Sequence, residues 1–237
     1  MNHPPIVLLP GLLCNAELFA PQLRMLAPHC QTLVADLSHD DSLPAMARRV
    51  LEQAPETFTL LGLSMGGYLA FEVLRQAPQR VERLALLSTS ARPDTVETAA
   101  LRRDMMALVR KGRLAMLQRE GYVRSVHESR LVDKGLQQTL MDMAMAMGPA
   151  CFERQQRAIM ARPDSRPILP DISRPALVMV GESDQITPPE CAREIARAIP
   201  GAQLHVLPQC GHISSLERPD EVNAILRTWL GIGVNPS

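Results

Sequence analysis

The feature that most constrains the fold is a regular alternation of short apolar runs with longer amphipathic segments. Predicted strands lie at residues 6–10, 31–36, 58–62, 83–88, 176–181 and 203–208. Predicted helices lie at residues 17–27, 42–54, 65–77, 188–199 and 216–230. Continuously apolar strands separated by helices are typical of a parallel sheet that is covered on both faces. Right-handed crossovers then predict a doubly wound α/β core, in which ligands bind at the carboxyl ends of the strands.

The alternation lapses over residues 92–167, where the sequence predicts several helices and no convincing strand. We therefore expect an α/β core formed by residues 1–91 and 168–237, with residues 92–167 inserted as a helical cap. The insertion contains the methionine run MDMAMAM at 141–147. Because the run alternates every second residue, a single helix face cannot hold all of it. These methionines either contact a flexible aliphatic ligand or form the apolar underside of the cap.

Charge balance and cysteine usage limit the class of protein. Lys plus Arg and Asp plus Glu both total 25, so the whole chain presents no field that would attract nucleic acid. No apolar stretch approaches the ~20 residues needed to span a bilayer, and the first residues lack the basic region of a signal peptide. The five cysteines show no CxxC spacing, which indicates free thiols in a reducing compartment rather than a zinc site. We expect a cytoplasmic protein that binds neither nucleic acid nor membrane.

One segment, FTLLGLSMGGYLAFEVL at 58–74, passes from a predicted strand to a predicted helix through the motif GLSMG, centred on Ser64. Gly-x-Ser-x-Gly in this context is the pattern of a nucleophile elbow, a sharp turn from which the serine Oγ projects. Strand and helix approach closely there, and Gly62 and Gly66 supply the two positions that cannot carry bulk. The Met65 amide lies at the helix N-terminus, where a free N–H and the helix dipole favour negative charge.

This strand, motif and helix, together with two downstream residues, resemble the α/β-hydrolase superfamily. The resemblance implies an α/β-hydrolase fold, with a mainly parallel six-stranded sheet flanked by helices and an inserted helical cap. It also implies a catalytic triad in the chain order Ser, then Asp or Glu, then His. Asp184, in VMVGESDQITPPE, and His212, in LPQCGHISSLERPD, each follow a predicted core strand. On this resemblance Ser64 is the nucleophile, His212 the base and Asp184 the acid that orients the base.

Other residues compete for the acid and base roles. Asp36 follows an earlier predicted strand, Asp94 lies at the entry to the insertion, and Glu182 is expected to be a solvated neighbour. His205 lies inside a predicted strand, where we expect it to be packed. Asp184 also fits an N-cap or turn residue before TPPE. We favour the triad assignment given above.

The negative charge that forms on a carbonyl oxygen during nucleophilic attack needs preorganised N–H donors. We expect one donor to be the Met65 amide and the other to lie in LLPGLLCNAELF, after the first predicted strand. Superfamily members commonly have His-Gly-x there, whereas this chain has Pro10-Gly11-Leu12 and keeps the glycine and the following amide. The expected second donor is therefore the Leu12 N–H. Cys14, in the same loop, is expected to fill space.

Together these residues predict a serine hydrolase that cleaves an ester-type bond through an acyl-enzyme, without a metal or an organic cofactor. The expected substrate is a small-molecule ester or acyl compound. The segments PGLLCNAELF and GLSMGG are also similar to the methyl esterases of biotin synthesis, which act on a carrier-bound acyl chain.

Three alternatives to this interpretation stay open at this point. A lyase or a carbon–carbon bond hydrolase would use the same triad, and a ligand-binding relative would use none of it.

The charge of the insertion is relevant to possible binding partners. Its 14 Lys and Arg residues against 9 Asp and Glu residues give a net charge of +5. That charge fits solvated helices, which we favour, or a docking surface for an acidic carrier protein.

Overall fold

A computed structural model describes residues 3–233, and within them a six-stranded sheet has the order β2-β1-β3-β4-β5-β6. The strands are β1 (Ile6–Leu9), β2 (Thr32–Val34), β3 (Phe58–Leu63), β4 (Val81–Leu87), β5 (Ala176–Gly181) and β6 (Gln203–Leu207). Every pair of neighbouring strands in it is parallel. The predicted sheet is therefore confirmed.

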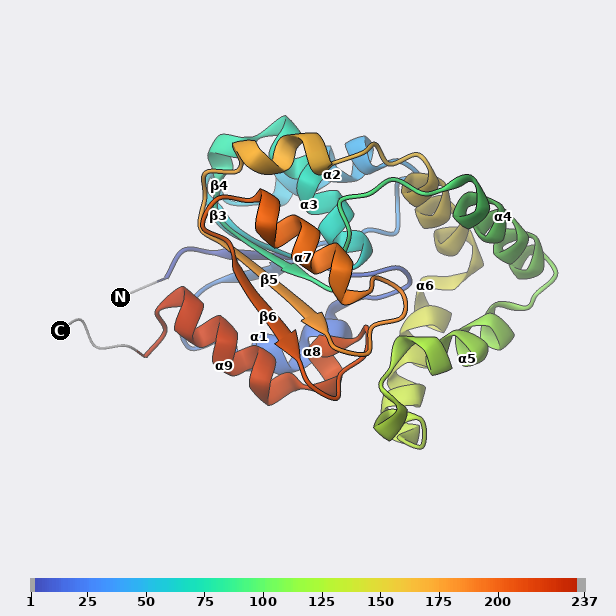
Figure 1. Ribbon diagram of the computed structural model, residues 1–237. Coiled ribbons are helices and arrows are strands. Elements are labelled where there is room, and N and C mark those ends of the chain that lie inside the picture. Colours follow the sequence, from blue (N-terminus) through green and yellow to red (C-terminus); the bar gives the residue numbers. More distant parts are fainter. Residues whose placement is uncertain (1–2, 234–237) are drawn as a thin grey trace.

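Helices cover both faces of this sheet, as the sequence pattern predicts. Figure 1 shows α2 (Leu43–Gln53), α3 (Met65–Gln76) and α7 (Pro189–Ala198) on one face. The other face carries α1 (Ala20–Leu26), α8 (Ser214–Glu217) and α9 (Pro219–Leu230). Short 3-10 helices are η1 (Ala16–Phe19), η2 (Pro78–Arg80), η3 (Glu128–Arg130) and η4 (Arg166–Asp171).

Two predicted helices are each divided in the structure. The segment 17–27 consists of the 3-10 helix η1 followed directly by α1. The segment 216–230, predicted as a single helix, belongs to two helices that meet at Arg218. Pro219 explains the break, because proline lacks the N–H that would continue the first helix and disfavours helical backbone at the preceding residue.

Side chains of the interior strands contribute to two hydrophobic cores, one on each face of the sheet. Leu60 of β3 and Val178 of β5 belong to the cluster that includes α2, α3 and α7. Their neighbours Leu61 and Met179 belong to the cluster that includes α1 and α9. Successive side chains of a strand point to opposite faces, so a strand buried on both sides must be apolar throughout. This arrangement explains the uninterrupted apolar runs in the sequence.

The segment between β4 and β5, which we call the insertion, contains three further α-helices: α4 (Val96–Arg110), α5 (Leu114–Ser125) and α6 (Lys134–Met160). Figure 1 shows them beyond the carboxyl ends of the strands. Within the described residues this stretch contains no strand, as predicted, while the domain boundaries near residues 92 and 167 stay predictions. None of the helices between residues 3 and 233 is both long and apolar enough to cross a membrane.

Helix α6 is kinked where the methionine run ends. Gly148 has a φ of 78° and is followed by Pro149, which interrupts the helical hydrogen bonding. Within the run, Met143 is buried and Met145 is 42% exposed. The expectation that one helix face cannot hold the whole run is therefore confirmed.

Candidate active site

Ser64 occupies the sharp turn between β3 and α3. Its φ of 56° lies in a region that side chains other than glycine rarely adopt, so the surrounding structure must hold the turn. The Thr89 hydroxyl donates to the Ser64 carbonyl at 2.8 Å. A Cβ atom on Gly62 would overlap the backbone of Gly66, and one on Gly66 would overlap the Leu9 carbonyl. Close approach of strand and helix accounts for both glycines.

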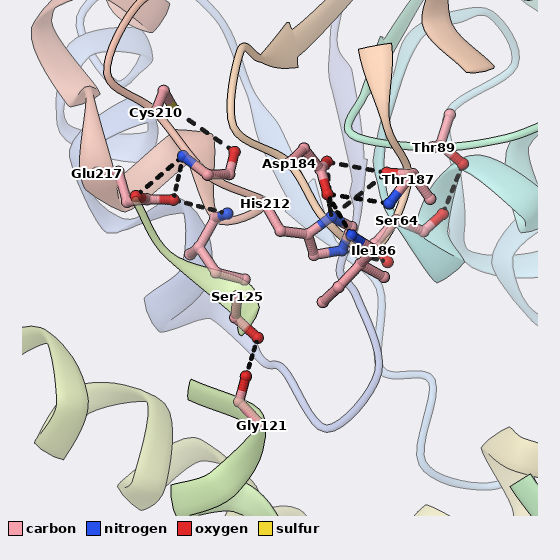
Figure 2. Close-up of polar contacts among 12 residues, drawn as sticks. Ser64, Thr89, Gly121, Ser125, Asp184, Ile186, Thr187, Cys210, His212 and Glu217 are labelled. Atoms are coloured by element: carbon pink, nitrogen blue, oxygen red, sulfur yellow. Dashed lines mark hydrogen bonds and ion pairs between the residues drawn. The ribbon is translucent and has the colours of Figure 1, made fainter. Parts of the chain in front are cut away.

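A continuous chain of hydrogen bonds links the three residues that the sequence singles out. His212, in the loop after β6, lies with its Nε2 atom 2.9 Å from the Ser64 Oγ atom. Its Nδ1 atom lies 2.8 Å from Oδ2 and 3.0 Å from Oδ1 of Asp184, in the loop after β5. Figure 2 shows the three side chains meeting at the carboxyl ends of their strands. Asp184 is 3% exposed and His212 is 4% exposed.

The Asp184 carboxylate is held by its own loop as well as by His212. Its Oδ1 atom accepts the backbone N–H groups of Ile186 and Thr187, each at 2.9 Å, and its Oδ2 atom accepts the Thr187 hydroxyl at 2.9 Å. Burial alone would raise the pKa of Asp184, but the charge of His212 and these hydrogen bonds hold that pKa below its usual range. The group is therefore an ionised carboxylate directed at the Nδ1 atom of His212.

Thr187 is a residue that the sequence analysis missed. Its hydroxyl lies 3.3 Å from the His212 Nδ1 atom as well as contacting Asp184. The Asp-x-x-Thr spacing, which is typical of a loop closed by an aspartate side chain, was the available signal.

The rival acidic residues and the rival histidine lie elsewhere. Asp36 pairs with a neighbouring histidine at 3.1 Å on an exposed surface, and Asp94 is buried in ion pairs with two arginines. Glu182 is exposed, and His205 is half-buried on β6. In the described part of the chain, none of the four forms a hydrogen bond with the serine or with the histidine discussed above.

The loop after β1 runs alongside the serine. A Cβ atom on Gly11 would lie 3.5 Å from the Cβ atom of Ser64. The two amides expected to bind an oxyanion, those of Leu12 and Met65, donate no hydrogen bond within residues 3–233. Neither N–H group is therefore committed to another partner in the part of the chain that the structure describes.

Helix α6 of the insertion reaches into this loop through Gln155, which the sequence analysis also missed. The Leu13 N–H donates to Gln155 Oε1 at 2.8 Å, and Gln155 Nε2 donates to the Leu37 carbonyl at 3.1 Å. Leu13 has a φ of 57°, and Gln155 is fully buried. No local pattern marks such a residue, because its partners lie more than a hundred residues away in sequence.

A cavity of about 440 Å³ opens onto Ser64 and His212, a volume in the usual range for small-molecule sites. Its lining is mainly apolar and comes from β3, α3, the loops around these two residues and the insertion: Gly11, Leu12, Leu13, Cys14, Leu63, Ser64, Tyr68, Thr98, Leu101, Arg102, Met105, Leu114, Leu117, Gln118, Gly121, Arg124, Ser125, Leu140, Phe152, Gln156, Ile159, Ile186, His212 and Ile213. Met105 is the methionine in this lining, and the run at 141–147 contributes none.

The sequence of the chain matches a known protein family. The sequence profile described as "Alpha/beta hydrolase family" matches residues 6–225, which is most of the chain. The chain belongs to this family. The α/β-hydrolase interpretation of its sequence is confirmed.

Individual relatives of this hydrolase match it over nearly its whole length. The pimeloyl-[acyl-carrier protein] methyl ester esterase of Xanthomonas oryzae pv. oryzae (strain MAFF 311018) is 30% identical over 248 residues, covering 97% of this chain and 96% of the relative. A thermophilic esterase from Thermogutta terrifontis superposes with a TM-score of 0.89 at 29% identity, over 97% of this chain and 90% of that one. The enol-lactonase from Burkholderia xenovorans LB400 has a TM-score of 0.86 at 26% identity, over 98% and 92%.

The cysteines of the hydrolase are all free thiols in the described residues. Cys14 lines the cavity, but burial raises its pKa to about 12, which makes its thiol a poor nucleophile at neutral pH. Among residues 3–233, no group of three or more His, Cys, Asp or Glu side chains is arranged to hold a metal ion.

Proposed function

We propose that this hydrolase cleaves a carboxylic ester through an acyl-enzyme, with Ser64 as nucleophile, His212 as base and Asp184 as the acid that orients the base. Its family and its esterase relatives identify it as an enzyme that acts on ester bonds. The observation that carries the triad proposal is the buried hydrogen-bond chain from Ser64 through His212 to Asp184 at the floor of the cavity.

In the first half-reaction, the Ser64 Oγ atom attacks the ester carbonyl while His212 Nε2 removes its proton. Asp184 accepts a hydrogen bond from Nδ1 and stabilises the imidazolium that forms. The amides of Leu12 and Met65 donate to the negatively charged oxygen of the tetrahedral intermediate. That intermediate collapses by breaking the bond to the alcohol oxygen, which takes the proton from His212 Nε2 and leaves.

In the second half-reaction, water replaces the alcohol. His212 Nε2 removes a proton from the water as its oxygen attacks the acyl carbon bound to Ser64. Collapse of the second intermediate breaks the bond to Oγ, which recovers the proton from His212. The products are one carboxylic acid and one alcohol, and Ser64 is regenerated.

The insertion serves in this proposal as a cap over a small-molecule ester. Its aliphatic side chains at Leu101, Leu114, Leu117 and Leu140 line the cavity and suit an apolar part of the substrate. A carrier-bound acyl ester, as named for the Xanthomonas relative, is the substrate class to examine after simple esters.

The basic character of the insertion fits a solvated surface better than a docking patch. Several of its arginines are already in ion pairs with carboxylates of the chain: Arg92, Arg102, Arg110, Arg130, Arg157, Arg162 and Arg166. These pairs occupy half of the 14 Lys and Arg residues at positions 92–167, so the charge that a docking partner could contact freely is smaller than the sequence suggests. The proposed substrate is accordingly a small molecule first and a carrier-bound group second.

Hydrolysis of p-nitrophenyl esters from acetate to decanoate, with wild type beside Ser64→Ala, tests this function. We expect turnover by wild type and a loss of about 10³-fold or more in the variant, because the nucleophile is removed. The far-ultraviolet circular dichroism of the two proteins should agree. The chain length that is hydrolysed fastest will measure how much of the cavity the acyl group fills.

Three results would contradict the proposal. Ser64→Ala with most of the wild-type activity would exclude Ser64 as nucleophile. Turnover without covalent labelling of Ser64 by a fluorophosphonate, detected as an unchanged intact mass, would favour proton abstraction as in a lyase. Binding of esters by folded protein without any turnover would favour a ligand-binding relative.

A further inference from the structure

A buried glutamate beside the histidine loop has no part in the chemistry described above. Glu217, the last residue of α8, is fully buried, and within residues 3–233 it forms no ion pair with a lysine or an arginine. Burial raises the pKa of its carboxyl, although backbone hydrogen bonds and His212 oppose that rise. A buried carboxylate without a cation is costly unless hydrogen bonds compensate it. The bonds that Glu217 makes therefore indicate its role.

Its carboxylate binds backbone amides on both sides of His212. The Gly211 N–H lies 3.1 Å from each Glu217 oxygen, and the Ile213 N–H donates to Oε1 at 3.0 Å. A third donor comes from the insertion, where the His127 N–H lies 2.7 Å from Oε2. Figure 2 shows the Glu217 carboxylate facing the backbone next to the His212 side chain.

The insertion also contacts the histidine loop directly. The His212 N–H donates to the Ser125 carbonyl at 2.9 Å. A Cβ atom on Gly211 would lie 2.6 Å from the His127 nitrogen, so at this point the two backbones touch. The three consecutive amides from residue 211 to residue 213 are thus all bound, two to Glu217 and one to the end of α5.

We propose that Glu217 is a positioning residue, which fixes the backbone that carries His212 and joins it to the insertion at His127. The inference rests on the proposed function, because it assumes that His212 is the base. Asp184 orients the imidazole ring, whereas Glu217 fixes the position of the backbone from which that side chain extends. A base that must lie 2.9 Å from the serine hydroxyl is sensitive to that attachment, since a misplacement of about 1 Å costs about 10²-fold in rate.

The variant Glu217→Gln tests whether the Glu217 carboxylate positions His212. Glutamine keeps the shape but replaces one accepting oxygen with an NH₂ group that faces N–H donors. We expect kcat to fall about 10- to 100-fold with KM unchanged, because the substrate cavity is intact while the base is displaced. A purely structural role would lower the melting temperature and leave kcat per folded molecule as in wild type.

Glu72→Gln is the matched control. Glu72 is a buried glutamate of α3 whose side chain bonds to Arg75 and Gln76 and, among residues 3–233, to none of the loops at the site. If Glu217→Gln and Glu72→Gln have the same kcat, the proposal is wrong. If wild type neither hydrolyses the esters nor reacts with a fluorophosphonate, the proposed function fails instead, so the two failures are distinguishable.

A second pair of variants tests the link to the insertion and serves if Glu217→Gln does not fold. His127 has φ −64° and ψ 150°, and the preceding Val126 is extended, so the backbone angles at position 127 suit proline. The proline Cδ atom takes the place of the N–H and must displace the Glu217 Oε2 atom, which lies 2.7 Å from the nitrogen. His127→Pro removes the N–H that Glu217 accepts, whereas His127→Ala removes the imidazole and keeps that N–H. We expect kcat about 10-fold lower for the proline variant than for the alanine variant, at equal KM. Equal kcat values would overturn the link.

Discussion

At the scale of single residues, the site depends on groups that are held away from their ordinary states. Ser64 keeps a left-handed backbone, and Asp184 stays ionised although it is almost fully enclosed. In both cases the surrounding hydrogen bonds supply the compensation, from Thr89 to the serine carbonyl and from Thr187 to the carboxylate. Removing the hydrogen-bond partner or the charge of such a residue should therefore change the stability of the protein markedly.

Asp184→Asn should change how stability depends on pH. The pKa of Asp184 is lower in the folded protein than the ~3.9 of an unfolded chain, so its stabilising contribution is present above that value and is lost as the pH falls through the folded value. The difference in unfolding free energy between wild type and Asp184→Asn should therefore shrink as the pH is lowered below about 4 and through the folded pKa. Urea denaturation at several pH values measures it. A difference that does not vary with pH would contradict this account.

At the scale of elements, the order and type of strands and helices follow from periodicity and from glycine and proline, which are local signals. That Ser64, Asp184 and His212 lie together was predictable, because each lies in the turn or loop that follows a strand and the resemblance gives their order. Gln155 and Glu217 were not predictable. Their partners are backbone atoms of other elements, brought together only by the packing of the insertion on the sheet.

Gln155→Leu should disturb the loop after β1 from a distance. The substitution leaves the Leu13 N–H and the Leu37 carbonyl without partners, which costs about 1–3 kcal/mol for each buried group. We expect kcat for ester hydrolysis to fall about 10-fold, because the Leu12 amide moves with this loop.

The control for that prediction lies on the same helix. Gln138 is exposed and bonds only to Asp142 among the described residues, so Gln138→Leu should retain wild-type kcat. Thermal melts and steady-state kinetics of the two variants separate the stability effect from the rate effect. Equal kcat values would exclude a role for Gln155 at the loop.

At the scale of the whole molecule, a buried ionic cluster joins the two ends of the insertion and connects them to a helix that covers the sheet. Asp94, just before α4, accepts from Arg102 of α4 and from Arg162, just after α6. The Arg162 guanidinium also lies 4.3 Å from the centre of the Tyr68 ring on α3. The ends of the insertion are thus joined to each other and to the helix that follows Ser64.

Asp94→Asn should be strongly destabilising. It would leave two guanidinium groups, Arg102 at 15% and Arg162 at 8% side-chain exposure, side by side without a counter-charge. Loss of one partner of a buried ion pair costs about 3–5 kcal/mol, whereas an exposed pair contributes about 1 kcal/mol or less. Glu153→Gln, which removes the more exposed pair with Arg110, is the control. Urea unfolding that gives the same loss for both variants would contradict the assignment.

The spacing of the proposed catalytic groups along the chain has a consequence for synthesis. The serine and the histidine that it contacts are 148 positions apart, and every strand of the sheet lies before the histidine. A nascent polypeptide that has emerged only as far as β5 can form the turn at Ser64 but lacks His212, the proposed base. The proposed hydrolytic activity therefore arises late in translation, and fragments released before residue 212 are inert toward esters.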